Sequence, residues 1–200
     1  MRLPDPRLGV VVPAAGAGRR LGTPKALARL GGETFVARVV REAARVAGDI
    51  VVVLGPRAEE ARPLVPSPAR VVVHEGWERG RTGSIKAGLA ALGDVDAFLV
   101  WPVDVPLARA EDAIALLRAA PRGPAVPVVD GRRGHPVLLP ASLRADVLAL
   151  ADDEPLHGIV RAAAPREVTV DNAGVLFDVN TPEDLRRAEA FAAAFPGAVE

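Results

Sequence analysis

Val12-Pro13-Ala14-Ala15-Gly16-Ala17-Gly18-Arg19-Arg20-Leu21-Gly22-Thr23-Pro24-Lys25 is the most informative segment of the sequence, and it continues the apolar run of residues 8–12. Three of its glycines are spaced so that backbone N–H groups can close around an anion, and two arginines and a lysine accompany them. Only two of the 25 basic residues are lysine, and both, Lys25 and Lys86, lie in segments that we assign to the nucleotide. The stretch predicts a strand that ends in a triphosphate cradle.

Composition limits the class of protein and of partner. The chain has 200 residues, half of them hydrophobic, which fits one globular domain over residues 1–200. Zero formal net charge argues against nucleic acid or an anionic membrane as the main partner. The absence of cysteine excludes disulfides, thiolate metal sites and a cysteine nucleophile. The apolar runs have the length of strands and the N-terminus lacks a signal-peptide core, so we expect a cytoplasmic protein.

Strand and helix patterns alternate along the first half of the chain. Short apolar strands are expected at residues 8–12, 50–54, 70–74 and 97–100. Helical patterns are expected at residues 34–47, 57–64, 82–92 and 110–119. This βαβαβ order predicts parallel strands with right-handed crossovers.

The second half has a more mixed pattern. Two strands, 125–129 and 135–139, flank a polar turn, which predicts an antiparallel excursion. Further elements are expected as helices at 142–150 and 156–163, strands at 167–170 and 175–178, and a closing helix after Thr181 and Pro182. The prediction is a single-domain α/β fold, Rossmann-like, with a mixed, mostly parallel sheet and helices on both faces.

Ligands bind at the carboxyl ends of strands in such a sheet, and this rule brings three loops together. They cover residues 16–25, 75–84 and 102–107. Asp104 follows the strand at 97–100 and is placed to bind a metal ion. Magnesium with a triphosphate needs one or two protein carboxylates, because phosphate oxygens and water complete its coordination.

Two other nucleotide loops fit the first stretch less well. A dinucleotide-binding turn would have a third glycine where Leu21 stands, and an acidic residue after the second strand, which instead ends in Leu54 and Gly55. A Walker A loop would have Ser or Thr after the lysine, but Ala26 follows Lys25. Both alternatives are therefore rejected.

The motifs, taken in order, resemble the MobA/MocA-like NTP transferase family, which has a glycosyltransferase-A-like sheet. Its signature L-x-A-G-x-G-x-R-M/L-G-x-P-K is matched at Ala15, Gly16, Gly18, Arg20, Leu21, Gly22, Pro24 and Lys25. Its later segments resemble residues 81–89, 104–107, 134–138 and 178–184. The resemblance therefore covers nearly the whole chain.

The resemblance implies a role for each matched position. The nucleotide-binding residues would be Ala14, Ala15, Gly16, Gly18, Arg20, Lys25, Arg81, Gly83, Ser84 and Gly88. The catalytic residues would be Arg20, Lys25 and Asp104. Asp104 and Asn180 would bind Mg²⁺ or Mn²⁺, and His135 would contact the acceptor.

The implied reaction is transfer of CMP from CTP to a phosphate-bearing acceptor, namely molybdopterin, with release of pyrophosphate. CTP is the expected donor because purine-using members of the family tend to have glycine where Ala15 stands. A molybdoenzyme apoprotein is the implied protein partner.

Departures from the family pattern keep other functions open. Residues 12–16 are closer to polyol-phosphate cytidylyltransferases, and Asn180 stands where the cytidylyl branch has an aspartate. The alternatives are a guanylyltransferase of the same family, a sugar- or polyol-phosphate nucleotidyltransferase, and a non-catalytic molybdenum-cofactor chaperone. Trp77 and Trp101 are interpreted as packing residues, and the acidic run 152–154 as a solvated loop.

Overall fold

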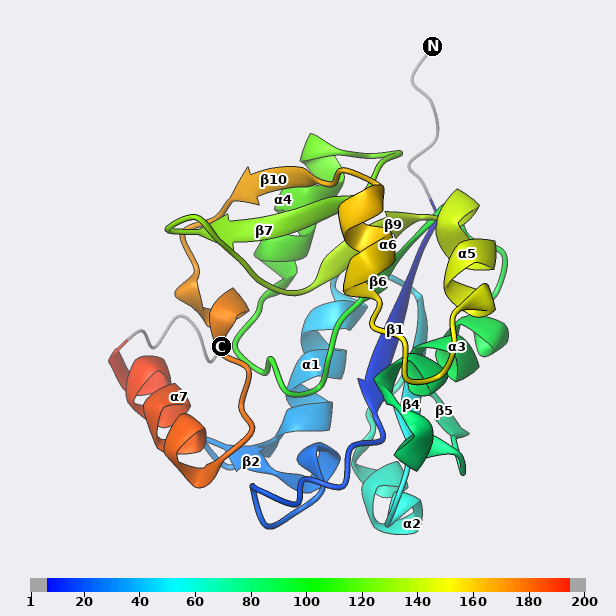
Figure 1. The fold of residues 1–200 in the computed structure, drawn as a ribbon. Coiled ribbons are helices and arrows are strands. Elements are labelled where there is room, and N and C mark those ends of the chain that lie inside the picture. The colour runs from blue at the N-terminus through cyan, green and yellow to red at the C-terminus, as the bar shows by residue number, and fades with distance from the viewer. Residues whose placement is uncertain (1–6, 195–200) are drawn as a thin grey trace.

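Seven strands form one continuous path in the computed structural model, which describes residues 7–194 (Figure 1). Their order is β10-β7-β9-β6-β1-β4-β5, and β8 pairs with β7 beside the path. Their bounds are β1 Leu8–Ala14, β4 Asp49–Leu54, β5 Arg70–Val73, β6 Ala97–Val100, β7 Ala125–Val129, β8 Arg132–Arg133, β9 Val137–Pro140 and β10 Arg166–Thr169.

The sheet is mixed and mostly parallel, as predicted. β1 pairs in parallel with both β4 and β6, and the pairs β4–β5 and β7–β10 are parallel as well. β9 runs antiparallel to both β6 and β7, which confirms the expected excursion. The chain order reverses on either side of β1, and ligands bind at such a switch point. The loops that follow β1 and β6 therefore lie where a site is expected.

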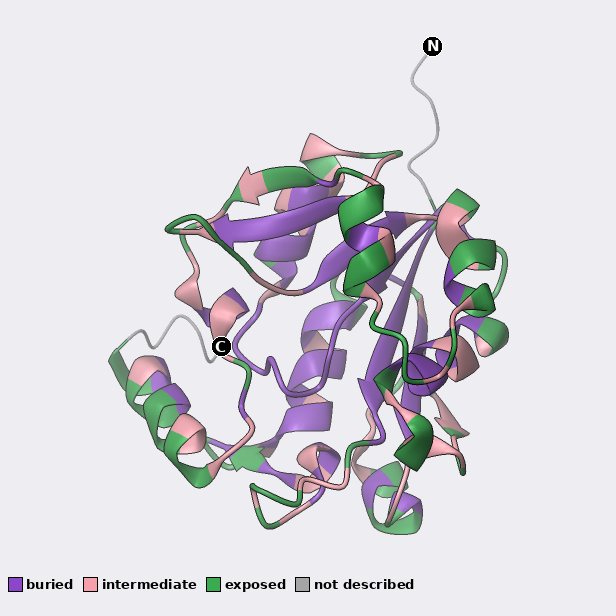
Figure 2. Ribbon diagram, in the orientation of Figure 1, coloured by how far each residue is buried: buried purple, intermediate pink, exposed green. Residues whose placement is uncertain are grey.

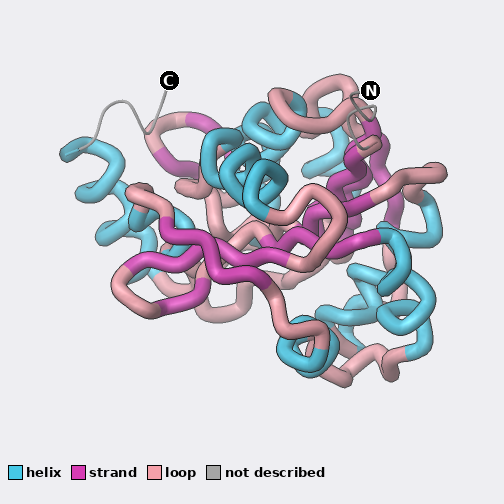
Figure 3. The backbone as a smooth tube through the Cα atoms, turned by 90° about the horizontal axis from the view of Figure 1, so that it is seen from above, coloured by secondary structure: helices cyan, strands magenta, loops and turns pink. Residues whose placement is uncertain are grey.

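Helices cover both faces of this sheet (Figure 3). Their bounds are α1 Phe35–Ala44, α2 Ala58–Ala61, α3 Arg81–Ala91, α4 Ala110–Ala119, α5 Arg144–Ala149, α6 His157–Ala162 and α7 Pro182–Ala194. Short 3₁₀ turns are η1 Lys25–Leu27, η2 Arg62–Leu64, η3 Trp77–Arg79, η4 Ala141–Leu143 and η5 Ala173–Leu176.

The alternation of side chains along the strands divides the core into two layers. Val10 and Val12 of β1 face a cluster built on α1, α4 and α7, whereas Val11 faces a second cluster built on α3, α5 and α6. The central strands are buried along their length (Figure 2). Burial on both faces explains why β1 and β4 have continuous apolar sequences. None of the described helices is long and apolar enough to cross a bilayer.

One local expectation was wrong, and one pair of strands was not predicted. Residues 175–178 form no strand, because η5 and an irregular segment occupy this part of the chain. A two-stranded hairpin, β2 (Arg29–Leu30) with β3 (Glu33–Thr34), precedes α1 and was not predicted. Thr34 then caps α1, since its side chain accepts a hydrogen bond from the amide of Ala37.

Candidate active site

The glycine-rich loop leaves β1 at Ala14 and turns tightly at Gly18. Gly18 has a φ of +62°, and a Cβ there would lie 1.7 Å from the carbonyl oxygen of Thr23, so only glycine fits. The amides of Leu21 and Gly22 donate to the carbonyl of Gly18 and close the turn. Within residues 7–194, the amides of Gly16, Ala17 and Gly18 have no hydrogen-bond partner. They are available to an anion, as the cradle requires.

Four predicted site residues, Lys25, Arg81, Asp104 and Asn180, meet at the end of this loop. The ammonium group of Lys25 is hydrogen-bonded to Asp104 and donates to the amide oxygen of Asn180 at 2.7 Å. The guanidinium of Arg81 donates to the same Asp104 oxygen at 3.2 Å. Residues from four distant parts of the sequence thus form one polar cluster around a carboxylate that is only 3 % exposed.

Asp178 is a member of this cluster that sequence reasoning missed. Its carboxyl group lies close enough to that of Asp104 for each to shift the pKa of the other. The signal was present, because Asp178 begins the segment Asp178-Val179-Asn180 that resembles the closing family motif. No strand forms there, and the irregular segment after η5 carries both Asp178 and Asn180.

The pKa values of the two carboxyl groups, Asp104 and Asp178, are shifted in opposite directions. Burial alone would raise the pKa of Asp104, but the charges of Lys25 and Arg81 outweigh it and hold the pKa below its usual value. Burial, and then the negative charge of Asp104, raise the pKa of Asp178. The cluster therefore keeps Asp104 ionised.

The donor atoms suit a hard divalent cation. Within the described part of the chain, no group of three or more His, Asp or Glu residues is arranged to hold a metal. Asp104 and Asp178 supply carboxylate oxygens, and Asn180 supplies an amide oxygen that already accepts from a cation, the ammonium of Lys25. Two carboxylates and an amide match the few oxygen ligands that magnesium takes beside phosphates.

A small cavity of about 150 Å³ adjoins the cluster. Ala15, Gly16, Lys25, Arg81 and Ser84 are among the predicted nucleotide-binding residues, and all five line it together with Asp104. Ligand cavities usually measure about 300 Å³ or more, so this one is sized for part of a nucleotide. Trp77 also lines it and lies outside the two buried core clusters, so its interpretation as a packing residue stays a prediction. Trp101, in contrast, is fully buried as expected.

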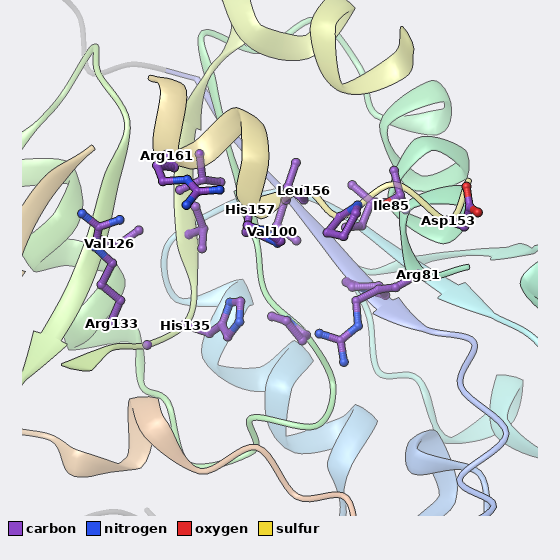
Figure 4. A pocket seen from close by; sticks show the side chains of 17 residues that line it. Arg81, Ile85, Val100, Val126, Arg133, His135, Asp153, Leu156, His157 and Arg161 are labelled. Carbon is purple, nitrogen blue, oxygen red and sulfur yellow. The ribbon is translucent and has the colours of Figure 1, made fainter. Parts of the chain in front are cut away.

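A second cavity of about 540 Å³ lies on the other side of Arg81 and Pro13, which line both cavities. Its walls are mostly apolar, and Arg133 and Arg161 add positive charge at its rim (Figure 4). His135 and Arg81 lie on opposite sides of its lower part (Figure 4). The predicted acceptor residue, His135, is therefore in a cavity that adjoins the nucleotide residues.

Other predicted residues lie outside the two cavities. Gly88 lies where a Cβ would meet Val11 and Val53, so it permits close packing of α3 on the sheet and is not brought to the site. Gly83 and the buried Ala14 border the site without lining either cavity, and the exposed Arg20 lies in the loop after Gly18. Lys86 contacts the carbonyl of Leu150 and the carboxylate of Asp152.

His135 is held neutral. Burial lowers its pKa to about 4, and its Nδ1 has no hydrogen-bond partner within the described residues. A neutral imidazole can donate a hydrogen bond to the acceptor substrate or accept one from it, but it does not act as a general acid near neutral pH.

This shift predicts a pH effect on stability. Between about pH 6.5 and about pH 4 the unfolded chain binds a proton that folded His135 does not, so the free energy of unfolding falls as the pH falls. At about pH 5 the loss should be roughly 2 kcal/mol. Urea unfolding near pH 7 and near pH 5 measures it. His135→Asn should remove this part of the pH dependence, and exposed His157→Asn should not; an unchanged dependence in His135→Asn would refute the assignment.

Comparison with known proteins agrees with this geometry. The family model described as MobA-like NTP transferase domain matches residues 10–168. The chain is 34% identical to the 2-C-methyl-D-erythritol 4-phosphate cytidylyltransferase of Frankia casuarinae, over 96% of this chain and 84% of that protein. It is also 34% identical to the molybdenum cofactor guanylyltransferase of Acidiphilium cryptum, over 92% of this chain and 94% of that protein.

Solved structures share the fold. The crystal structure of Rv0371c from Mycobacterium tuberculosis H37Rv superposes with a TM-score of 0.81 at 26% identity, over 92% of this chain and 97% of that one. Rv0371c has also been crystallised as a complex with manganese. The family model covers most of the chain, and relatives at 34% identity span nearly all of it. The chain therefore belongs to the MobA-like NTP transferase family of nucleotidyltransferases.

Proposed function

We propose that this protein transfers CMP from CTP to the phosphate group of a small-molecule acceptor and releases pyrophosphate. The observation that carries the proposal is the junction of the two cavities at Arg81, beside the cluster of Lys25 and Asp104. In this proposal the small cavity binds the nucleotide and the large cavity binds the acceptor. Their shared wall is where the two phosphate groups would meet.

The proposed chemistry is an in-line displacement at the α-phosphorus. An oxygen of the acceptor phosphate forms the new bond to the α-phosphorus, and the bond from that phosphorus to the oxygen bridging to the β-phosphate breaks. Pyrophosphate leaves with the electron pair. A phosphate monoester is already anionic near neutral pH, so no general base is needed. Neutral His135 accordingly serves to hold the acceptor.

Charge neutralisation and positioning supply the catalysis. Lys25 and Arg20 would hold the departing pyrophosphate, and Arg81 would approach both phosphates from the shared wall. A divalent cation on Asp104, Asp178 and Asn180 would neutralise charge on the phosphates. The amides of Gly16 to Gly18 would bind the triphosphate, and Ala15 and Ser84 would border the base.

The curated relatives favour a polyol phosphate as acceptor, as does the opening of residues 12–16. A second candidate, molybdopterin, is favoured by the volume of about 540 Å³ and the apolar walls of the acceptor cavity. The contact between Lys25 and Asp104 supports an enzyme over a non-catalytic chaperone. Pyrophosphate release from CTP, measured with 2-C-methyl-D-erythritol 4-phosphate and with molybdopterin separately, tests the choice.

The base preference is a separate expected result. Ala15 lines a cavity of about 150 Å³, where a purine would clash or lose hydrogen bonds. CTP should be preferred to GTP by about tenfold to a hundredfold in kcat/KM, and Ala15→Gly should narrow that gap. The measurement compares CTP, UTP, GTP and ATP with one fixed acceptor on both proteins. A wild-type preference for GTP would assign the chain to the guanylyl branch instead.

A further inference from the structure

One wall of the large cavity is made by the connection between α5 and α6, residues 150–156, which we name the acceptor loop. Asp153, Pro155 and Leu156 of this loop line the cavity, and Asp153 and Leu156 are labelled in Figure 4. The loop passes beside the first turns of α3 (Figure 1). Its position therefore determines the shape of the cavity.

The acceptor loop is attached to α3 by three hydrogen-bonding groups. The ammonium of Lys86 donates to the carbonyl of Leu150 at 2.7 Å and to the carboxylate of Asp152 at 3.0 Å. The hydroxyl of Thr82 donates to the carbonyl of Glu154 at 2.5 Å. The amide of Gly83 donates to the carbonyl of Asp152 at 3.3 Å. A run of acidic residues that the sequence predicted as solvated is thus fixed to a helix.

The contact is close as well as polar. A Cβ on Gly80 would lie 2.1 Å from the carbonyl oxygen of Asp152, and a Cβ on Gly83 would lie 3.1 Å from its side chain. The Lys86 and Asp152 side chains are 26% and 25% exposed, so their ion pair is screened less than a surface pair. Arg79 also pairs with Asp152, but its side chain is 71% exposed. Lys86 is the more buried of the two cations.

Lys86 is not placed to contact the nucleotide. It lines neither cavity among the described residues, and two of its three N–H donors are used on the loop. On the same helix, Arg81 and Ser84 line the nucleotide cavity. The helix α3 therefore borders the nucleotide cavity and also holds the acceptor loop, which forms one wall of the large cavity.

We propose that Lys86 is a positioning residue that fixes the acceptor loop on α3 and thereby sets the affinity for the acceptor without changing that for the nucleotide. This rests on the proposed function, because it takes the large cavity as the acceptor site. Lys86 touches neither substrate. Its effect reaches the acceptor through Asp153, Pro155 and Leu156.

The test compares Lys86→Met, Lys86→Arg and a control. Lys86→Met keeps much of the apolar stem and removes the charge, and Lys86→Arg restores a cation. Arg70→Met is the matched control, since Arg70 likewise donates to one carboxylate, Asp49, and one carbonyl, Ala91, at the far end of α3. Lys86→Met should raise KM for the acceptor about tenfold, leave KM for CTP within about twofold, and be largely rescued by arginine. Equal changes in both KM values, or no change, would overturn the proposal.

Hydrogen exchange separates this proposal from the proposed function. With CTP and magnesium as the only additions, amides of residues 151–158 should exchange about tenfold faster in Lys86→Met than in wild type, while those of β1 and β4 keep their rates. Arg70→Met should leave the loop unchanged. If wild type transfers CMP to no tested acceptor, the proposed function fails, and exchange still decides whether Lys86 fixes the loop. If the amides of the acceptor loop exchange at the wild-type rate in Lys86→Met, the proposal that Lys86 fixes this loop is refuted.

Discussion

An Asp104→Asn variant is expected to lose transfer activity by at least about a thousandfold and to lose stabilisation by CTP with magnesium. Asp104 is buried, stays ionised, and is the anion that Lys25 and Arg81 share. A neutral amide of the same shape removes the main anionic oxygen, and Asn180 beside it is already neutral. Activity with CTP, and the thermal shift that CTP causes at increasing magnesium concentration, measure the effect.

Asp112→Asn is the matched control for this variant. Asp112 of α4 is another buried carboxylate, 4% exposed, but it accepts hydrogen bonds from Asn172 and from the amide of Arg109, and it lines neither cavity. The Asp112→Asn variant should change the free energy of unfolding, and its activity should depend on magnesium as in wild type. Wild-type metal dependence in Asp104→Asn would show that the metal binds elsewhere.

Lys25→Ala is expected to lower turnover about a hundredfold while the fold remains intact, since a preorganised donor at developing charge contributes about 3 kcal/mol. The side chain of Lys25 is only 13% exposed and its ammonium lies within the polar cluster. Steady-state kinetics with CTP and a fixed acceptor measure the loss. Arg19→Ala is the control, because Arg19 is a cation of the same loop that is 82% exposed. Full activity in Lys25→Ala would remove the cradle assignment.

The sheet was predictable because its physical signals are local. Apolar runs bounded by glycine, proline or charge gave β1, β4, β5 and β6, and the βαβ order gave their parallel arrangement. The antiparallel excursion followed from the polar turn between β7 and β9. The hairpin of β2 and β3 was not predicted because its strands have two residues each, which is too short for a periodic pattern.

Parts of the site depended on tertiary contacts that no local pattern contains. The topological rule for parallel sheets brought the loops of Lys25, Arg81 and Asp104 together correctly. Asp178 was missed because its interaction with Asp104 joins residues that are far apart in the sequence. Gly88 was assigned to the nucleotide from a motif, yet its position is explained by the packing of α3 on Val11 and Val53. The partner of Lys86 lies 66 residues away in an acidic run, so its pairing could not be read from spacing.

Transfer of CMP by this protein is tested by following the α-phosphate of CTP. The protein is incubated with CTP labelled at the α-phosphorus, magnesium and a phosphate-bearing acceptor, with 2-C-methyl-D-erythritol 4-phosphate and molybdopterin as separate arms, and the products are resolved. The label is expected to move to one acceptor, in equal amount to the pyrophosphate released, and Asp104→Asn should abolish this transfer. Label that stays in CTP with both acceptors, or that appears only as free CMP, would contradict the proposed transfer.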